Sequence, residues 1–439
     1  MSRANWGSKL GFILAASGSA VGLGAIWKFP YVAGKNGGGA FLIAYLVCVF
    51  TLGISMLLAE MLIGRAARKS ATTAYRELKG KLWPWAGRLS VLCVFIILSF
   101  YSVVGGWTIA YILRSITGEA ITADTGALKA AFGSFIANPL EAIAYSAAFF
   151  GITMGVVLGG VQAGIERMSK ILMPTLFILM LLLIARALTL PGAIDGVMYF
   201  ITPDWSKVSA SMLLEAMGLA IFSLSIGGGM IIAYGSYLSS DTKLVGATLW
   251  VSALATLACI LAGLMVLPAV FAFGVDPAAG PGLTFITMPA IFAKMPMGQG
   301  LAVAFFLLLL FAALTSSVSI LEPIVAFLMD EFHWQRKPAT IAVTIASFAL
   351  SIPAALSFGV MEKDTLFGKT AFDLMDYTAS NVLMPAGGLL AAVFVGWAIW
   401  PRIETELRNE GAAAILPAFR VICGFVAPIL IGYIWIHGL

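Results

Sequence analysis

Long runs of apolar residues, separated by short polar connections, dominate the pattern along this chain of 439 residues. A helix needs about 20 mainly apolar residues to cross the hydrocarbon core of a bilayer. We count about eleven such runs, at 9–32, 38–66, 84–118, 139–160, 168–190, 209–239, 243–274, 297–329, 338–358, 371–400 and 413–436. The pattern therefore predicts an all-α membrane protein with about eleven transmembrane helices in a single domain, residues 1–439.

Clusters of glycine interrupt two of these runs. The first run contains SGSAVGLGAIWKFP (17–30), and the sixth contains FSLSIGGGM (222–230). Each glycine weakens a helix by about 0.5–1 kcal/mol relative to alanine. Because the two interrupted runs begin the two halves of the chain, we expect a 5+5 inverted repeat with discontinuous helices 1 and 6. Helices 1–5 would form the first repeat (9–190), helices 6–10 the second (209–400), and helix 11 (413–436) would be additional.

Unwound backbone in the middle of a membrane must be satisfied by the protein itself or by a ligand. Free carbonyl oxygens can replace water around Na⁺, and helix N-termini favour the anionic group of a solute. Close packing between helices is the alternative reason for glycine in a membrane. Two clusters at corresponding positions favour a binding site.

Charge adds an orientation and argues against other classes of function. Only 11% of the residues are charged, and lysine and arginine concentrate in the connections after the second, fourth, eighth and tenth runs. The positive-inside rule then places the N-terminus in the cytoplasm and the C-terminus outside, in the cell inner (plasma) membrane. The net charge of +5 reflects this bias and does not indicate nucleic acid. We find no zinc spacing, phosphate loop or nucleophile motif, so we expect no catalytic residues and no enzyme.

Five segments resemble the neurotransmitter:sodium symporter family, which includes bacterial amino-acid transporters. They are SGSAVGLGAIWKFPYVAGKNGGGAF (17–41), FSLSIGGGMIIAYGSY (222–237), FITMPAIF (285–292), ALTSSVSILEPIVAFLMDE (313–331) and FDLMDY (372–377). The resemblance covers essentially the whole chain and keeps the order of the motifs. It implies two sodium sites beside a central solute pocket.

The second sodium site is intact by this resemblance. Its ligands would be the backbone carbonyls of Gly18, Val21 and Ala312 and the hydroxyls of Thr315 and Ser316. Oxygen ligands of this kind suit a hard cation. The alternative is that these hydroxyls only bond back to carbonyls of their own helix.

The first sodium site departs from the family pattern. Ala25 and Ala255 stand where the family has ligating side chains, so only a backbone carbonyl and the Ser223 hydroxyl remain. We therefore expect coupling to about one Na⁺ per cycle. The alternative is that Ser19 or, as the better candidate, Thr256 supplies the missing oxygen. The chloride site of animal relatives also lacks its polar residues here, so we expect no dependence on chloride.

The resemblance also implies a pocket and two gates. The solute would be bound by Val21, Gly22, Gly24, Ile97, Tyr101, Phe222, Ser223, Ser225, Gly228 and Ile320. The outer gate would be the pair Lys28 and Asp376, above a lid of Phe222 and Tyr101. The cytoplasmic gate would consist of Arg3, Trp6, Asp330 and Tyr237. Glycine at position 228 opens space for a larger solute, unless a neighbouring side chain fills it.

Two carboxylates, Glu60 and Glu322, fall inside apolar runs, where a charge is costly. We interpret both as structural groups that satisfy unwound backbone near helices 1 and 6. A protonatable coupling role for Glu322 is the alternative.

Together these features predict a sodium-coupled symporter that imports a small zwitterionic solute, with a neutral amino acid as the first expectation. Its partners would be the solute, Na⁺ and membrane lipid, and a monomer would suffice for transport. Two alternatives stay open. One is uptake of an amino sulfonate such as taurine or another non-carboxylate solute, and the other is a Na⁺-independent exchanger.

Overall fold

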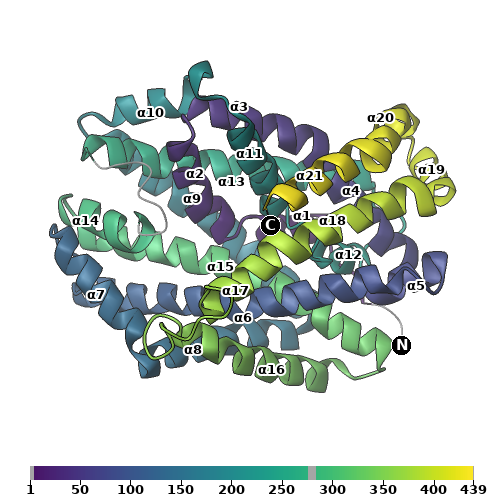
Figure 1. Ribbon diagram of the computed structural model, residues 1–439, viewed down its shortest axis with the longest axis horizontal. Helices are drawn as coiled ribbons and strands as arrows, with labels where there is room; N and C mark the ends of the chain where they lie inside the picture. Colours follow the sequence, from purple (N-terminus) through teal and green to yellow (C-terminus); the bar gives the residue numbers. More distant parts are fainter. Residues whose placement is uncertain (1–3, 275–282, 439) are drawn as a thin grey trace.

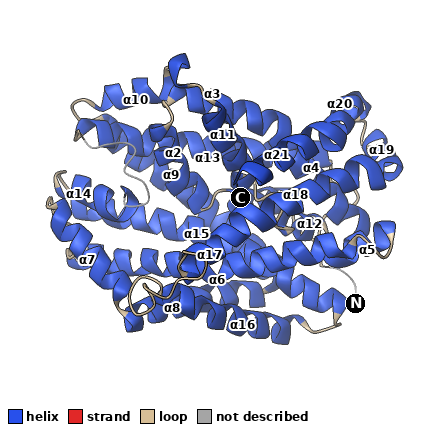
Figure 2. Ribbon diagram, viewed as in Figure 1, coloured by secondary structure: helices blue, strands red, loops and turns tan. Residues whose placement is uncertain are grey.

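The computed structural model describes residues 4–274 and 283–438, and within this part every regular element is helical (Figure 2). Figure 1 shows α6, α8, α15 and α16 running along the long axis of the molecule, and α15 packs against both α6 and α16. The predicted all-α class is confirmed.

Nine helical segments of the described residues are long and apolar enough to cross a membrane. They are Gly39–Ala67 (α3, Gly39–Cys48, and α4, Ile54–Ala67), Pro84–Thr117 (α6), Pro139–Leu158 (α8), Val161–Leu188 (including α9, Arg167–Leu188), Leu244–Ala272 (α13), Gly298–Glu331 (α15), Arg336–Leu356 (α16), Ala371–Ala398 (α17, Ala371–Tyr377, and α18, Met384–Val393) and Ala413–Ile436 (α20, Leu416–Val421, with most of α21, Ala427–Gly438).

Two further apolar runs are occupied by broken helices. In the first, α1 (Lys9–Ala20) meets the segment Gly24–Lys35, which ends in α2 (Phe29–Lys35), at an angle of 52°. The sixth run is divided into α11 (Ala210–Ser223) and α12 (Met230–Gly235), each too short to cross alone. All eleven predicted runs are thus occupied, and both breaks fall at the glycine clusters that predicted them.

Short helices connect these segments at the two ends of the molecule. They are α5 (Ala71–Lys79), α7 (Thr125–Ala137), α10 (Ala193–Ile201), α14 (Met288–Ala293) and α19 (Trp400–Asn409). Figure 1 shows α5 and α19 at the same end as the beginning of the described chain, and α7, α10 and α14 at the opposite end. We call these the inner and the outer end, after the orientation that the positive-inside rule predicts.

Candidate functional site

The break in the sixth run is held open by groups from other helices. Gly227 has φ +94°, and a Cβ there would lie 2.1 Å from the Met384 carbonyl oxygen, so only glycine fits. Its N–H donates to Glu60 Oε1 at 2.6 Å, and its carbonyl accepts from the Ser90 hydroxyl at 3.1 Å. Glu60 therefore satisfies unwound backbone, and that prediction is confirmed.

Hydroxyl groups join the two breaks to each other. Ser225, in the break of the sixth run, donates to the Ser19 carbonyl at 2.9 Å, and the two side chains are 3.0 Å apart. The Ser319 hydroxyl, on α15, donates to Ser19 Oγ at 2.8 Å. On the outer side of the first break, Leu23 N–H lies 3.4 Å from Tyr101 Oη. Ser319 was not predicted, although it stands one helical turn after Ser316 and thus on the same face of its helix.

The residues of the second sodium site lie together where α1 ends beside α15. The Ser316 hydroxyl lies 3.3 Å from the Gly18 carbonyl oxygen, and an ideal Cβ on Gly18 would be 3.0 Å from Thr315 Cβ. Thr315 Oγ1 donates back to the carbonyl of Ala312 at 3.0 Å, which is itself one of the expected ligands. Val21 is buried at the point where α1 loses helical geometry, with ψ +61°. Carbonyl and hydroxyl oxygens are the ligands that hard cations prefer.

Hydrocarbon fills part of the region of the first sodium site. Ala25 and Ala255 are fully buried. The Ser223 hydroxyl is 2.9 Å from Tyr45 Oη. Because Ser19 already bonds Ser225 and Ser319, Thr256 is the freer group: its buried hydroxyl has no hydrogen-bond partner within the described part of the chain.

A small central cavity of about 60 Å³ lies between the two breaks. Of the ten residues expected to bind the solute, all except Val21 and Gly228 line it. The lining residues that were not predicted to bind solute are Ser19, Ala20, Leu23, Phe100, Met230, Ser316 and Met384. A Cβ on Gly228 would lie 2.7 Å from Met230 Cε. The space left by Gly228 is therefore filled by the Met230 side chain, which was the alternative that the sequence left open.

Shortening Met230 to alanine should enlarge the central cavity and widen the range of solutes. The removed atoms border both the cavity and the Gly228 backbone, so bulky solutes gain space. We expect bulky solutes to compete at least about tenfold better against a small solute, worth about 1.4 kcal/mol of binding. Met180→Ala is the control, because Met180 is equally buried and lies away from the cavity. If competing solutes keep the same order of potency in Met230→Ala, the Met230 side chain does not limit the size of the solute.

A larger vestibule of about 420 Å³ lies on the outer side of the central cavity. Phe222 and Tyr101 line both spaces, so they lie between them as a lid would. Lys28 and Asp376 also line the vestibule. Lys28 Nζ lies 5.4 Å above the Phe222 ring and Asp376 accepts from Ser380, and no ion pair joins Lys28 to Asp376 among the described residues. The outer pair is apart in this structure.

At the inner end, Trp6 is bonded to the segment that contains α12. Its indole N–H donates to the Tyr234 carbonyl at 3.0 Å, and its backbone N–H donates to the Tyr237 carbonyl at 3.1 Å. Asp330 accepts from the backbone N–H of Ser70 at 2.6 Å. Arg3, the remaining member of the expected inner gate, lies outside the described residues. In this structure a vestibule thus lies at the outer end, while Trp6 is held by backbone carbonyls at the inner end.

Glu322 differs from its prediction. Its fully buried carboxylate accepts two hydrogen bonds from the Arg336 guanidinium, at 2.7 and 2.8 Å, and one from Tyr237 Oη at 2.5 Å. It therefore joins α15 and α16 to the turn after α12, and within the described part of the chain its partners are side chains and not unwound backbone. The sequence interpretation was wrong here because a bidentate partner on another helix cannot be seen in the pattern of one segment.

Two broken helices whose exposed backbone meets hydroxyls beside a small cavity define a secondary transporter. A family model described as the sodium:neurotransmitter symporter family matches residues 3–125 and 142–439. The chain belongs to this family, whose members are transporters and not enzymes, and it is a sodium-dependent, multi-pass membrane protein.

Similar proteins agree with this membership. The chain is 39% identical to the uncharacterized sodium-dependent transporter YhdH of Bacillus subtilis, over 98% of this chain and 97% of that protein. It is 26% identical to the bovine sodium-dependent dopamine transporter, over 97% of this chain and 67% of the relative. Among solved structures, MhsT in complex with L-phenylalanine matches with a TM-score of 0.91 and 42% identity, over 100% of each chain. The resemblance noted in the sequence is confirmed.

Proposed function

We propose that this protein is a sodium-coupled symporter that imports a neutral amino acid with about one Na⁺ per cycle. The observation that carries the proposal is the contact of the Ser316 hydroxyl with the Gly18 carbonyl, at 3.3 Å, where α1 ends beside α15. Na⁺ at this second site would be held by Gly18, Val21, Ala312, Thr315 and Ser316. It would fasten α1 to α15 and favour the outward-facing state.

The amino-acid substrate rests on chemistry within the central cavity. The carboxylate of a zwitterion would be received by backbone N–H groups around Gly22–Gly24 and by the Tyr101 hydroxyl. MhsT, 42% identical, was solved with L-phenylalanine, which supports the same class of solute here. An amino sulfonate such as taurine has the same charge pattern and is the second candidate.

The transport cycle would use both gates. Lys28 and Asp376 would approach one another as Phe222 and Tyr101 close over the solute, and Trp6 would leave Tyr234 and Tyr237 as the inner end opens. We place the N-terminus in the cytoplasm and the C-terminus outside, and we expect neither chloride dependence nor a need for more than a monomer. Ala25 and Ala255 are the reason for one Na⁺ instead of two.

Uptake into proteoliposomes tests the proposal. Labelled neutral, aromatic and sulfonated amino solutes are offered with an inward Na⁺ gradient, and with K⁺ in its place as control. We expect one class to accumulate only with Na⁺, with a Hill coefficient for Na⁺ near one. A coefficient near two would contradict the loss of the first site, and Thr256→Val would then test whether Thr256 supplies its oxygen. Accumulation without Na⁺ would favour the exchanger.

A further inference from the structure

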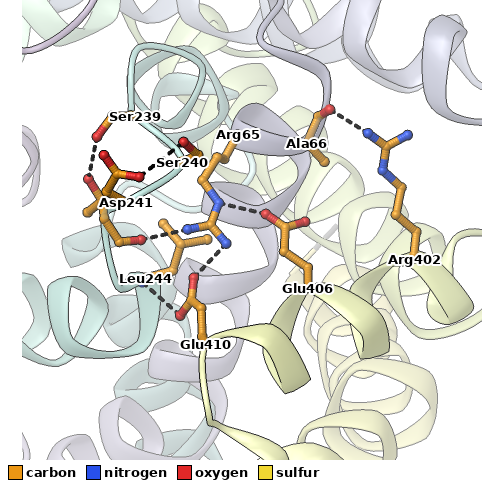
Figure 3. A network of polar contacts seen from close by, with 10 residues as sticks. Arg65, Ala66, Ser239, Ser240, Asp241, Leu244, Arg402, Glu406 and Glu410 are labelled. Atoms are coloured by element: carbon orange, nitrogen blue, oxygen red, sulfur yellow. Dashed lines mark hydrogen bonds and ion pairs between the residues drawn. The ribbon is translucent and has the colours of Figure 1, made fainter.

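Arg65 is a buried cation at the inner end of α4, outside the proposed solute and sodium sites. Its guanidinium contacts three groups (Figure 3). Nε donates to Glu406 Oε1 at 2.6 Å, a terminal nitrogen forms an ion pair with Glu410 Oε1 at 2.5 Å, and the other donates to the Thr242 carbonyl at 2.6 Å. Only 7% of the Arg65 side chain is exposed.

The three partners of Arg65 come from two different parts of the chain. Thr242 lies in the connection that follows α12, the inner half of the broken sixth helix. Glu406 lies on α19, and Glu410 directly follows it. α19 itself follows the inner end of the helical segment Ala371–Ala398, which we call span 10. The backbone reinforces the contact, because Glu410 Oε2 accepts from Leu244 N–H at 2.9 Å and Arg402 donates to the Ala66 carbonyl at 2.7 Å.

α4 and α12 are themselves in tight contact. A Cβ on Gly64, the residue before Arg65, would lie 2.1 Å from the Ile232 carbonyl oxygen, so the two backbones touch. α19, in contrast, packs mainly against its neighbours in the chain, the helical segment Phe394–Ala398 and α20. The polar contacts of Arg65 are therefore a main link between α19 and the α4–α12 pair.

Burial makes this link difficult to break. A guanidinium that loses its carboxylates in a buried site keeps its desolvation cost without its partners. The planar guanidinium also donates in fixed directions, so it fixes the relative orientation of its partners, which a flexible exposed pair does not. The Arg408–Glu404 pair on the exposed face of α19 provides a comparison, because its side chains are 58% and 36% exposed. Exposed ion pairs of this kind contribute little to stability.

We infer that Arg65 is a positioning residue that couples the inner half of the sixth helix to span 10. When α12 moves to open the inner end, Arg65 carries α19 with it. Asp376, the expected outer-gate residue, lies in α17, at the opposite end of span 10 from α19. Arg65 would thus link inner opening to outer closure through α19, the bend at Ile399 and the helical segment Ala371–Ala398. The inference rests on the proposed alternating access and goes beyond it, because nothing in a sodium or solute site requires α19 to move.

Distances between spin labels test the coupling in the full chain in nanodiscs. Labels are placed at the exposed positions Ser240, after α12, Asn409, on α19, and Lys337, on α16. Cys48→Ala removes the one cysteine that is not fully buried. On replacing Na⁺ by K⁺, we expect the Ser240–Lys337 and Asn409–Lys337 distances to shift together, while Ser240–Asn409 keeps one narrow distribution.

Variants show whether Arg65 causes the joint motion. In Arg65→Gln, the Ser240–Asn409 distribution should broaden and Asn409 should lose its response to Na⁺. Glu410→Gln should broaden the Ser240–Asn409 distribution to a smaller extent. Arg65→Lys should keep part of the response of Asn409 to Na⁺. Arg408→Gln, the matched control on the same helix, should behave as the unmodified chain.

The outcomes separate this inference from the proposed function. If Ser240 moves relative to Lys337 on Na⁺ removal while Asn409 does not, the coupling is overturned and alternating access stands. That result needs no variant, so it holds even if Arg65→Gln fails to fold. If no pair responds to Na⁺ or to solute, alternating access is overturned, and the coupling with it.

Discussion

The double variant Thr315→Val, Ser316→Ala should lose Na⁺-driven uptake completely. Both substitutions keep most of the side-chain volume and remove one hydroxyl each, so the packing of α15 against α1 is retained. Two of the five proposed oxygen ligands disappear, and the Gly18 carbonyl is left without its partner at 3.3 Å. We expect the apparent affinity for Na⁺ to fall at least about 100-fold, equivalent to roughly 2.8 kcal/mol.

The effect on Na⁺ can be measured without knowing the solute. A ligand that binds only the folded state raises the melting temperature with its concentration. We expect Na⁺, but not K⁺, to stabilise the unmodified protein, and the double variant to lose this difference. Ser317→Ala is the control, because its hydroxyl bonds Thr153 and the Leu314 carbonyl instead of α1. Full Na⁺ stabilisation in the double variant would place the ion elsewhere.

Gly22→Ala should abolish solute binding and weaken Na⁺ binding together. A Cβ at this position would lie 2.3 Å from Ser316 Oγ and 3.2 Å from Tyr101 Oη. The contact with Ser316 Oγ, a proposed sodium ligand, is below 3 Å and forces atoms to move, and the contact with Tyr101 Oη, a proposed solute ligand, is tight. We expect at least about a 100-fold loss in solute affinity.

A second glycine provides the comparison for Gly22. Gly218, on α11, has nothing within 4 Å of an ideal Cβ, so Gly218→Ala should bind and transport as the unmodified protein does. Binding of the solute found in the uptake panel, measured by displacement of label, checks both variants. Native affinity in Gly22→Ala would show that the first break does not border the solute.

The candidate site was predictable in part, and the successes share a cause. The hydroxyls at Thr315 and Ser316 and the glycines at 22 and 227 are local signals, since each is unusual inside an apolar run. The structure brings the first break beside Thr315 and Ser316 because α1 packs against α15, whereas Gly227 lies against Met384. Glu322 was misread and Arg65 was missed because their roles depend on partners from distant segments. Arg65 and Glu406 are 341 positions apart in the chain.

The sequence by itself determined the number and order of the apolar segments, the two breaks and the family. These follow from length, hydropathy and glycine placement, which act within one helix and need no partner. Only the tertiary structure decided which buried charge meets which. Glu60 meets the Gly227 backbone, Glu322 meets Arg336, and Arg65 meets two carboxylates of the chain around α19. A buried charge is tolerated only where packing supplies a counter-charge or donors, and that supply is set by the arrangement of helices in space.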